Sequence, residues 1–437
     1  YFIMCTAVIF FMSSINSKIL ASEYEIPVWS SQNNKINTNK IEENNNINTV
    51  NNTNVNATVE TNAYDVGKDV LNSNGAETNN PLKLTSGGAI LIEQTTGNVL
   101  YEHNMHEKLR PASVTKVMTI LLIMEAIDSG KISLNDKVPC SEKATGMGGS
   151  QIWLDTTEEL TVDEMLKAIC VVSANDCTVA MAEYLEGSEE AFVEKMNEKA
   201  KILGMNDTTF KNCHGIDEDG HLTSPYDIAV MSRELLLKHP SITNYTTIYM
   251  DSLRGGKSEL VNTNKLVRNY EGCTGLKTGS TSLALFNLSA SATKNGLSLI
   301  AVVMKGKTSS ERFNEARKLL DYGFTNYQYK DLGKANDVIG SAKINKGLES
   351  SVDAVIKNDV GVVMKKTKNA DIKQNVEIFN NISAPVTKGQ KIGEVVFFLD
   401  EKEIAKVDLI ASKDIAKYGL GSMITKVYKN WFTLIRN

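Results

Sequence analysis

Ser113 and Lys116 are the first residues in the chain whose types and spacing could perform a reaction. They belong to the stretch PASVTK at 111–116, directly ahead of a long apolar segment. In a helix, a spacing of three places both side chains on one face, and the helix N-terminus favours negative charge on the serine oxygen. A lysine becomes a useful base only if burial and a neighbouring cation lower its pKa. Taken alone, the pattern is a weak signal, because an N-cap serine followed by an exposed lysine is its usual explanation.

A second pair, Ser173 and Asn175, lies in the stretch VVSAND at 171–176, between two apolar segments. A serine hydroxyl can relay a proton between Lys116 and a leaving amine, and an asparagine amide can bind a substrate carbonyl. By itself, a Ser-x-Asn sequence at this place is most often a helix cap.

A third cluster, GLKTGS at 275–280, precedes a strand-like segment. A glycine at the edge of a strand lets an extended peptide approach closely. Lys277 and Thr278 could hold a terminal carboxylate, and the charge of Lys277 would also lower the pKa of Lys116. A single Lys-Thr-Gly turn is common, so only the combination of the three clusters is informative.

Ser-x-x-Lys, Ser-x-Asn and Lys-Thr-Gly, in this order, form the set found in β-lactamases and penicillin-binding proteins. From about residue 85 to 437, the chain resembles the low-molecular-weight D-alanyl-D-alanine carboxypeptidases. The resemblance includes four further stretches: GGSQI at 148–152, HG at 214–215, SPYD at 224–227 and RFNE at 312–315. It implies an α+β fold, with a penicillin-binding or β-lactamase-like transpeptidase domain followed by a small all-β domain and a C-terminal amphipathic helix.

The resemblance also implies roles for the residues of the first two clusters. Ser113 would be the acylated nucleophile, and Lys116 the base that takes its proton. Ser173 and Asn175 would assist proton transfer and substrate alignment. The backbone N–H groups of Ser113 and Ser280 would form the oxyanion hole, which contributes strongly to acyl transfer.

The substrate's C-terminus is assigned in the same way to the third cluster. Lys277 and Thr278 would bind the terminal D-alanine carboxylate, with Gly279 and Ser280 beside them. Arg312 matches an arginine often placed near that carboxylate in the family, although an exposed helix arginine paired with a glutamate is the competing interpretation. We therefore expect a serine carboxypeptidase that acts on peptidoglycan stem pentapeptides, needs no metal or organic cofactor and is acylated by β-lactams.

Several positions depart from the family pattern. Ala174 stands where glycine is more common, and Thr274 replaces a common aspartate. Ser280 occupies a variable position, and the stretch SLALF at 282–286 replaces a usually acidic, glycine-containing segment. We expect these changes to affect substrate preference rather than acylation.

Two alternative functions stay open on the sequence. A β-lactamase with these clusters uses a dedicated glutamate to activate its deacylating water, but Glu183, Glu186 and Glu189 follow Ser173 too closely to match that spacing. A wall-binding or sensory protein that keeps the fold without turnover is the other alternative. The presence of every catalytic residue type argues against it.

Hydrophobic periodicity predicts the framework that positions the clusters. Segments 89–93 and 98–102 are expected to form a β-hairpin, as are 285–293 and 297–304, joined by Lys294-Asn295-Gly296. Strands at both ends with helices between them indicate an α+β domain over 82–328. The expected helices are 113–130, 162–170, 175–185, 224–238 and 311–322.

The remaining segments differ in composition. Residues 329–413 contain short β-branched runs between Asn, Gly and Lys turns, which predicts an all-β domain. Residues 414–437 are expected to form an amphipathic helix with an aromatic, basic character that suits an anionic membrane surface. A helix packed back onto the β domain is the alternative.

At the other end, residues 1–22 form an apolar run that ends in small residues, which predicts a signal peptide or an N-terminal anchor. Residues 23–81 are rich in Asn and Thr and poor in large apolar side chains, which predicts a disordered spacer. We therefore expect an exported bacterial protein, either secreted or held at the outer face of the cytoplasmic membrane.

Composition argues against several other classes. The chain of 437 residues has a formal net charge of −5 and a pI near 5.8, which disfavours nucleic-acid binding. Its cysteines form no CxxC pair, and its histidines show no metal-ligand spacing with nearby carboxylates. Neither a redox motif nor a metal site is predicted.

Overall fold

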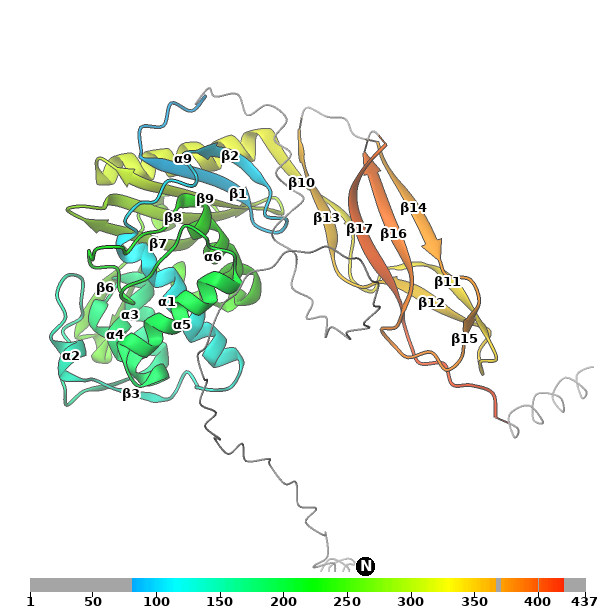
Figure 1. Cartoon of the computed structure of the whole chain (residues 1–437), viewed down its shortest axis with the longest axis horizontal. Coiled ribbons are helices and arrows are strands. Elements are labelled where there is room, and N and C mark those ends of the chain that lie inside the picture. The colour runs from blue at the N-terminus through cyan, green and yellow to red at the C-terminus, as the bar shows by residue number, and fades with distance from the viewer. Residues whose placement is uncertain (1–80, 367–370, 400, 420–437) are drawn as a thin grey trace, which may run out of the picture. The chain divides into compact units, whose positions relative to one another are not determined.

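The computed structural model describes residues 81–366, 371–399 and 401–419. The predicted leader, the predicted spacer up to residue 80 and the predicted C-terminal helix from residue 420 on lie outside this range. Within it, a region of mixed helices and strands extends to Asn326 and is followed by a region of β-strands (Figure 1).

The first region contains helices and strands in mixed order. Its α-helices are α1 (Lys116–Asp128), α2 (Glu142–Thr145), α3 (Val162–Val171), α4 (Asn175–Glu186), α5 (Glu189–Ile202), α6 (Pro225–Lys238), α7 (Thr243–Thr246), α8 (Leu266–Asn269) and α9 (Ser309–Asn326). Its 3-10 turns are η1 (Ala112–Thr115), η2 (Pro240–Ile242) and η3 (Arg254–Gly256). Its strands are β1 (Gly88–Glu93), β2 (Val99–His103), β3 (Lys137–Pro139), β4 (Glu159–Thr161), β5 (Met250–Leu253), β6 (Ser258–Val261), β7 (Cys273–Thr281), β8 (Leu285–Lys294) and β9 (Leu297–Gly306).

A five-stranded antiparallel sheet in the order β2-β1-β9-β8-β7 organises this region. Both predicted hairpins are confirmed, because β1 pairs with β2 and β8 pairs with β9. In the turn between β8 and β9, Asn295 and Gly296 have φ angles of 52° and 78°. Positive φ at both central residues is what an Asn-Gly hairpin turn requires. Strand β7, which carries the third cluster, forms one edge of the sheet.

The two faces of the sheet are buried in two different cores. Ile90, Ile300 and Val302 belong to the core that contains the buried faces of α1, α3, α4 and α6. Leu91 and Leu299 belong to a second core, with buried residues of α9. Because strand side chains alternate between the faces, a register slip of one residue would exchange the two cores. This double burial fixes the register of β1 and β9, and β7 is attached to them through its pairing with β8.

The helices expected at 162–170, 175–185, 224–238 and 311–322 form, as α3, α4, α6 and α9. The starts of α3, α6 and α9 are capped by side chains, whereas the N-cap residue of α4 is Ala174, which makes no side-chain cap. Thr161 and Glu164 make a capping box at α3, and Ser224 accepts the N–H of the third residue of α6. These caps satisfy backbone donors that would otherwise lack partners.

The helix expected to begin at Ser113 has a different start. Residues 112–115 form the 3-10 turn η1, and the α-helix begins only at Lys116. Ala112 has a φ of 50°, which an α-helical residue cannot adopt, so a tighter turn leads into α1. Side chains three residues apart are aligned in a 3-10 turn, so the Ser-x-x-Lys spacing still brings both side chains to one side.

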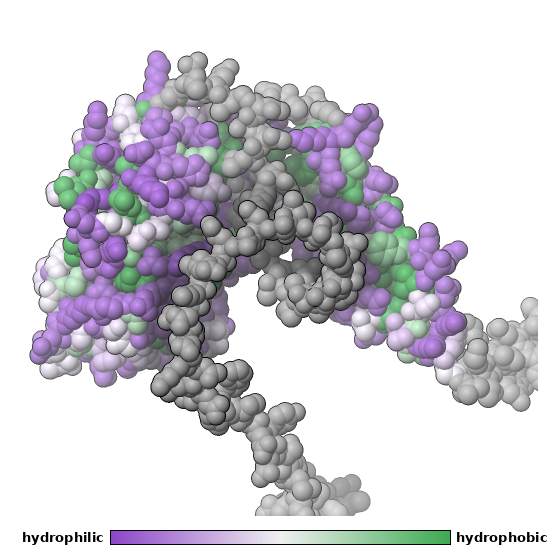
Figure 2. All heavy atoms as spheres, viewed as in Figure 1, coloured by the Kyte–Doolittle hydropathy of each residue, from purple (hydrophilic) through white to green (hydrophobic). Residues whose placement is uncertain are grey.

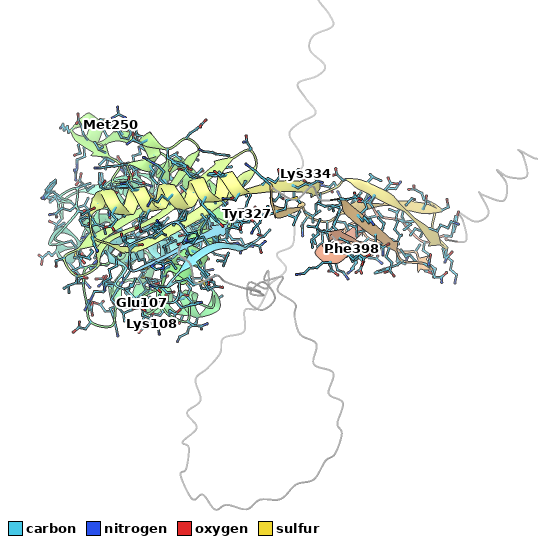
Figure 3. All side chains as sticks on the ribbon, turned by 90° about the horizontal axis from the view of Figure 1, so that it is seen from above. Glu107, Lys108, Met250, Tyr327, Lys334 and Phe398 are labelled. Atoms are coloured by element: carbon cyan, nitrogen blue, oxygen red, sulfur yellow. The ribbon has the colours of Figure 1, made fainter. Side chains whose placement is uncertain are left out.

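The second region is all β, as predicted. Its strands are β10 (Tyr327–Gly333), β11 (Val338–Asn345), β12 (Ser351–Ile356), β13 (Val360–Lys365), β14 (Ile372–Ile378), β15 (Ile382–Ser383), β16 (Lys391–Leu399) and β17 (Lys402–Ala411). A six-stranded sheet has the order β14-β16-β17-β12-β11-β15, and β10 pairs with β13. This second region has its own hydrophobic core, which includes Val395, Phe397 and Leu409. Tyr327 marks the junction between α9 and β10 (Figure 3).

The first residues of the predicted C-terminal helix are extended rather than helical. Residues 414–419 contain isolated bridges, in which Ile415 pairs with Val386 and Lys417 pairs with Gly347. Ile415 is buried against the β core. The amphipathic stretch from residue 420 on lies outside the described residues.

Three further properties concern the described residues only. None of their helices is both long and apolar enough to span a membrane. They contain no group of three or more His, Cys, Asp or Glu side chains placed to hold a metal ion. Their cysteines are free thiols: Cys140, Cys170, Cys177, Cys213 and Cys273. Figure 2 shows hydrophilic residues over much of the visible face, with hydrophobic residues scattered among them.

Candidate active site

Ser113 and Lys116 lie within hydrogen-bond distance of each other. Ser113 is partly buried in η1, and Lys116, the first residue of α1, is completely buried. The Nζ of Lys116 lies 3.1 Å from the Oγ of Ser113 and donates a hydrogen bond to it. This separation is within the range over which a base can take a proton from a hydroxyl.

Two oxygen atoms from distant parts of the chain hold the same nitrogen. The Nζ of Lys116 donates to the Oδ1 of Asn175 at 2.6 Å and to the main-chain carbonyl of His214 at 2.7 Å. The Nδ2 of Asn175 donates in turn to the carbonyl of Gly148 at 2.7 Å, so the amide oxygen must face the lysine. The Lys116 nitrogen is therefore directed toward Ser113 by fixed partners.

The environment of Lys116 lowers its pKa well below 10.5. Burial is the largest cause, because a buried ammonium loses its hydration, and the positive charge of Lys277 is the second. A lowered pKa increases the fraction of neutral amine near neutral pH. Only the neutral amine can accept the Ser113 proton.

Ser173 lies between the end of α3 and the start of α4 with an unusual backbone conformation. Its φ is 67°, and its side chain is 4% exposed. Within the described residues its Oγ is buried without a hydrogen-bond partner. A buried hydroxyl of this kind calls for an explanation, and a proton relay that is completed by substrate is one. Ser173 precedes by two residues Asn175, whose side chain contacts Lys116, and its role as a proton relay stays a prediction.

Strand β7 carries Lys277 and Thr278, both of which are buried. The Nζ of Lys277 donates to the carbonyl of Thr278 at 2.9 Å, and the hydroxyl of Thr278 donates to the Oγ1 of Thr263 at 2.8 Å. Burial lowers the pKa of Lys277 to about 7, and the charge of Arg312 acts in the same direction. Lys277 affects the pKa of Lys116, so the two ammonium groups share one electrostatic environment.

Gly279 brings β7 into direct contact with the segment that carries Ser113. A Cβ atom on Gly279 would lie 2.8 Å from the amide nitrogen of Val114 and 2.9 Å from that of Ser113. Only glycine permits this approach. The next residue, Ser280, is exposed. The two amides expected to form an oxyanion hole, those of Ser113 and Ser280, therefore belong to adjoining segments.

Arg312 supports β7 from α9, and the interpretation as an exposed helix arginine is wrong. It is 7% exposed, and its guanidinium donates to the carbonyls of Gly279 at 3.0 Å and Asn287 at 3.3 Å. The ring of Phe313 lies 4.8 Å from the guanidinium carbon. Burial lowers the pKa of Arg312 to about 10. Its described contacts are with two main-chain carbonyls, two aromatic rings and the Ser309 hydroxyl, so a direct role at the carboxylate stays a prediction.

His214 and Gly215 contribute to the site in a way that sequence reasoning did not assign. His214 contributes its main-chain carbonyl to Lys116. Gly215 has a φ of 94°, and a Cβ atom there would lie 1.9 Å from the carbonyl oxygen of Ala112. The glycine therefore allows this segment to pack against η1. Their only signal in the sequence was the His-Gly match to the family.

Asp176 is a second contributor that was missed. It is fully buried, and its Oδ2 accepts hydrogen bonds from the amides of Ile152 at 3.0 Å and Leu154 at 3.1 Å. The amide of Asn175 donates to the carbonyl of Ser150 at 2.7 Å. The GGSQI stretch is thus tied to the start of α4 and presents the Gly148 carbonyl to Asn175.

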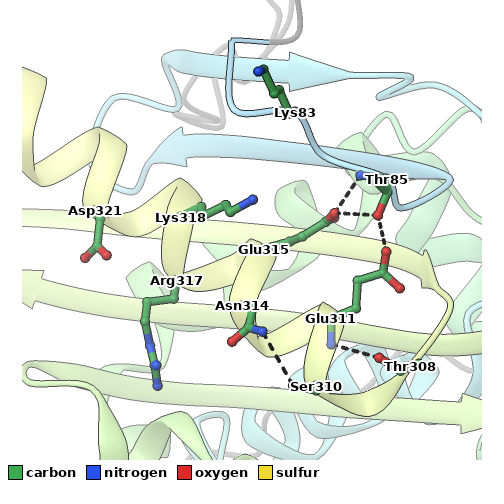
Figure 4. A pocket seen from close by; sticks show the side chains of 10 residues that line it. All are labelled: Lys83, Thr85, Thr308, Ser310, Glu311, Asn314, Glu315, Arg317, Lys318 and Asp321. Carbon is green, nitrogen blue, oxygen red and sulfur yellow. Dashed lines mark hydrogen bonds between the residues drawn. The ribbon is translucent and has the colours of Figure 1, made fainter.

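The surface cavity in Figure 4 is not part of this site. It has a volume of about 590 Å³ and lies between α9 and the segment before β1. Glu315 on α9 accepts a hydrogen bond from the amide of Thr85 at 2.6 Å within it. None of the predicted site residues lines it, so it has no part in the chemistry described here.

Comparison with known protein families gives matches in both the mixed region and the β region of the chain. The family model described as D-alanyl-D-alanine carboxypeptidase matches residues 74–308, and the model described as penicillin-binding protein 5, C-terminal domain, matches residues 327–417. The D-alanyl-D-alanine carboxypeptidase DacF of Bacillus subtilis (strain 168) is 45% identical over 347 residues, which cover 78% of this chain and 89% of the relative.

Solved structures resemble the chain in the same way. Penicillin-binding protein 5 from Haemophilus influenzae has 32% identity and a TM-score of 0.66, covering 77% of this chain and 98% of that chain. Penicillin-binding protein D2 from Listeria monocytogenes, in its ampicillin-bound form, has 29% identity and a TM-score of 0.52, covering 56% of this chain and 99% of that chain.

Proposed function

Since the chain belongs to the D-alanyl-D-alanine carboxypeptidase family, we propose that it removes the terminal D-alanine from peptidoglycan stem pentapeptides through an acyl-enzyme on Ser113. The observation that carries the proposal is the position of the Lys116 Nζ, 3.1 Å from the Ser113 Oγ, in surroundings that lower the pKa of the amine. A serine beside a neutral lysine has both groups that acyl transfer needs.

In the first half-reaction, the Oγ of Ser113 attacks the carbonyl carbon of the penultimate D-alanine. The Nζ of Lys116 takes the hydroxyl proton, and the amides of Ser113 and Ser280 stabilise the oxyanion. The C–N bond then breaks, and the leaving amine of the last D-alanine receives a proton through the hydroxyl of Ser173. The unpartnered, buried Oγ of Ser173 supports this relay.

In the second half-reaction, water attacks the ester on Ser113 and releases the shortened peptide. Lys116 takes a proton from the water and passes it to the Oγ of Ser113 as the ester bond breaks. Asn175 aligns the substrate, as well as orienting Lys116. Every proton thus passes through a group that belongs to this chain, and no metal or organic cofactor enters the proposal.

The terminal carboxylate of the substrate binds to Lys277 and Thr278 in this proposal. Both side chains are buried on β7, where a carboxylate would pair with the ammonium in a site of low polarity. Gly279 and Ser280 continue the strand and allow the peptide to lie alongside it. Arg312 adds positive charge behind the strand, because its guanidinium bonds the carbonyl of Gly279.

β-Lactams are the inhibitors that this proposal implies. The ampicillin-bound Listeria relative supports the idea that they acylate Ser113 in the same cleft. The family relationship favours a carboxypeptidase over both alternatives from the sequence, a β-lactamase and a wall-binding or sensory protein without turnover.

The deciding experiment uses purified protein and a pentapeptide that ends in D-Ala-D-Ala. We expect release of free D-alanine by the wild type and none by Ser113→Ala, with equal thermal unfolding temperatures. Fluorescent penicillin should label the wild type and fail to label the variant. Label that survives the substitution, or a wild type that releases no D-alanine, would refute the proposal.

We further propose that the protein is exported and that residues 420–437 bind the anionic face of the membrane. The aromatic and basic composition of this stretch supports the second idea, and the apolar run at 1–22 supports the first. A deletion from Gly419 onward should release the protein from vesicles that contain anionic lipid and leave peptide cleavage unchanged. Full retention on the vesicles after the deletion would show that another segment makes the contact.

A further inference from the structure

The segment from Asn212 to Ile216 is held by hydrogen bonds within itself and to Lys116. Its central carbonyl, that of His214, is one of the two oxygens that orient Lys116. The Oδ1 of Asn212 accepts the amide of Gly215 at 2.7 Å, and its Nδ2 donates to the carbonyl of Ile216 at 3.0 Å. These bonds fix the local turn, but they do not fix where the turn lies relative to the rest of the molecule.

Helix α5 fixes the position of residues 212–216 relative to the rest of the molecule through contacts at two points. The Asn197 side chain exchanges two 2.9 Å hydrogen bonds with the main chain of Phe210. Two turns earlier, Glu189 stands at the first position of the helix and is 8% exposed. Its Oε1 accepts the amide of Cys213 at 3.2 Å and lies 3.3 Å from the Nε2 of His214.

The hydrogen bonds of the His214 ring define its protonation. The Nδ1 of His214 accepts the amide of Ile216 at 3.1 Å, so Nδ1 carries no proton. The proton of the neutral ring is therefore on Nε2, which lies 3.3 Å from the Oε1 of Glu189. Burial lowers the pKa of His214 to about 4, so the ring stays neutral near neutral pH. The ring thus links the Glu189 carboxylate to the turn that carries the His214 carbonyl.

The carboxylate of Glu189 is fully engaged by these partners and by one lysine. Its Oε1 also accepts the thiol of Cys213 at 3.3 Å, and its Oε2 pairs with the Nζ of Lys143 at 3.0 Å. Burial raises the pKa of Glu189, and the hydrogen bonds from Cys213 and Lys143 oppose that rise. The group therefore stays ionised as a multiple acceptor, and it does not present a free oxygen to a substrate.

We propose that Glu189 is a positioning residue for acyl transfer, which holds the main chain of residues 213–215 so that the His214 carbonyl keeps the Lys116 amine directed at Ser113. The inference rests on the proposed function of Ser113 and Lys116. It deepens that function by naming the group, outside the three sequence clusters, on which the alignment of the base depends. The role is geometric and acts through the acceptor oxygen Oε1.

This geometric role predicts an order of activities among variants. Glu189→Ala removes the acceptor, lets the His214 carbonyl move and misaligns Lys116. Glu189→Gln keeps an acceptor oxygen of the same reach. Lys143 also pairs with Glu190 at 2.8 Å, so it keeps a partner in both variants. Glu190→Ala is the matched control, because it removes a carboxylate from the same lysine without touching residues 213–215.

The test measures acylation by fluorescent penicillin over a range of concentrations, together with D-alanine release from the pentapeptide. We expect Glu189→Ala to lower the saturating acylation rate constant and kcat about ten-fold to 100-fold, with the half-saturation concentration and KM unchanged. Glu189→Gln should lie within about three-fold of the wild type, and Glu190→Ala should equal it. A general loss of structure would not produce this split between rate and binding, or the rescue by glutamine.

Three results would overturn the inference. One is a Glu189→Ala variant that acylates at the wild-type rate, and another is a Glu189→Gln variant as slow as the alanine variant. The third is independent of any variant: nitrogen NMR of the wild type at pH 7 should show the Nε2–H tautomer of His214, and an Nδ1–H tautomer would remove the link. A wild type that neither acylates nor releases D-alanine would instead refute the proposed function.

Discussion

Replacement of Gly279 by alanine is the most direct test of how β7 positions the nucleophile. The added Cβ would lie 2.8 Å from the Val114 amide nitrogen and 2.9 Å from both the Ser113 nitrogen and the Pro111 carbonyl. All three atoms are main chain, so none can turn aside as a flexible side chain could. Either β7 or the η1 turn has to move.

The size of the movement follows from these distances. Ordinary contacts of a Cβ atom begin at 3.4 Å, so relief of the closest contact needs a displacement of about 0.6 Å. The Ser280 amide on β7 would move by a similar amount away from the oxygen and the amide of Ser113 on η1, with which it is expected to form the oxyanion hole. A misplacement near 1 Å can cost about 100-fold in rate, so we expect a loss of ten-fold to about 100-fold in acylation. Overpacking should also lower the unfolding free energy by about 1–3 kcal/mol.

The assay compares Gly279→Ala with Gly148→Ala in the rate of fluorescent penicillin labelling. Gly148 belongs to the same site, but nothing lies within 4 Å of a Cβ atom placed there, and its φ is not in the left-handed region. The control should therefore label at nearly the wild-type rate. If Gly279→Ala labels as fast as Gly148→Ala, the contact between β7 and η1 does not position Ser113 and the reasoning is wrong.

Three other perturbations have defined outcomes. Lys277→Met should abolish D-alanine release and yet raise the unfolding free energy at pH 7, because burial lowers the pKa of Lys277 from 10.5 to about 7. At 1.36 kcal/mol per pH unit, the gain in unfolding free energy is at most about 5 kcal/mol. Urea unfolding should show that this gain vanishes above pH 10.5. Burial lowers the pKa of His221 to about 4, so the contribution of its neutral ring to folding stability is complete above pH 6.5 and lost as the pH falls toward 4. The unfolding midpoint of the wild type should drop over that pH range, and that of His221→Gln should drop less. Both carboxylate oxygens of Asp176 accept main-chain amides, Oδ2 those of Ile152 and Leu154 and Oδ1 that of Cys177, so the amide nitrogen of Asp176→Asn must leave one set without an acceptor. The variant should cost about 1–3 kcal/mol in urea unfolding and label more slowly with penicillin, and an unchanged midpoint would contradict the assigned bonds.

The fold was predictable where a local signal and a periodic pattern agreed. The hairpin of β8 and β9 has both alternating apolar residues and an Asn-Gly turn, and it forms as expected. The start of α1 was not predictable in detail, because the left-handed backbone of Ala112 follows from its packing against Gly215, about a hundred residues later. Tertiary contact outweighs local propensity there.

The candidate site shows the same limit. Side chains with characteristic chemistry, such as Ser113, Lys116 and Lys277, were recognisable by type and order. The partners of Lys116 were not, because the His214 oxygen is a main-chain atom that every residue possesses. Arg312 could be read as a surface residue, since only the folded structure reveals the carbonyls that it bonds. Sequence patterns therefore identify reacting groups better than they identify the groups that orient them.

The acidic residues after Ser173 bear on how the acyl-enzyme is hydrolysed. Glu183 accepts a hydrogen bond from Ser141 at 2.6 Å, and Glu186 pairs with Lys131 at 2.8 Å. Glu189 is bound by residues 213–214 and Lys143.

Each of these three carboxylates is therefore bound by partners other than Ser113. Among the residues that the structure describes, the base beside the serine oxygen is Lys116. In the proposed mechanism the same amine must then serve acylation and hydrolysis. A peptide substrate loses its leaving amine after the first step, which opens a path for water. A β-lactam keeps its leaving amine covalently attached, so the adduct blocks that path, and the reaction should stop at the acyl-enzyme for lack of a second base.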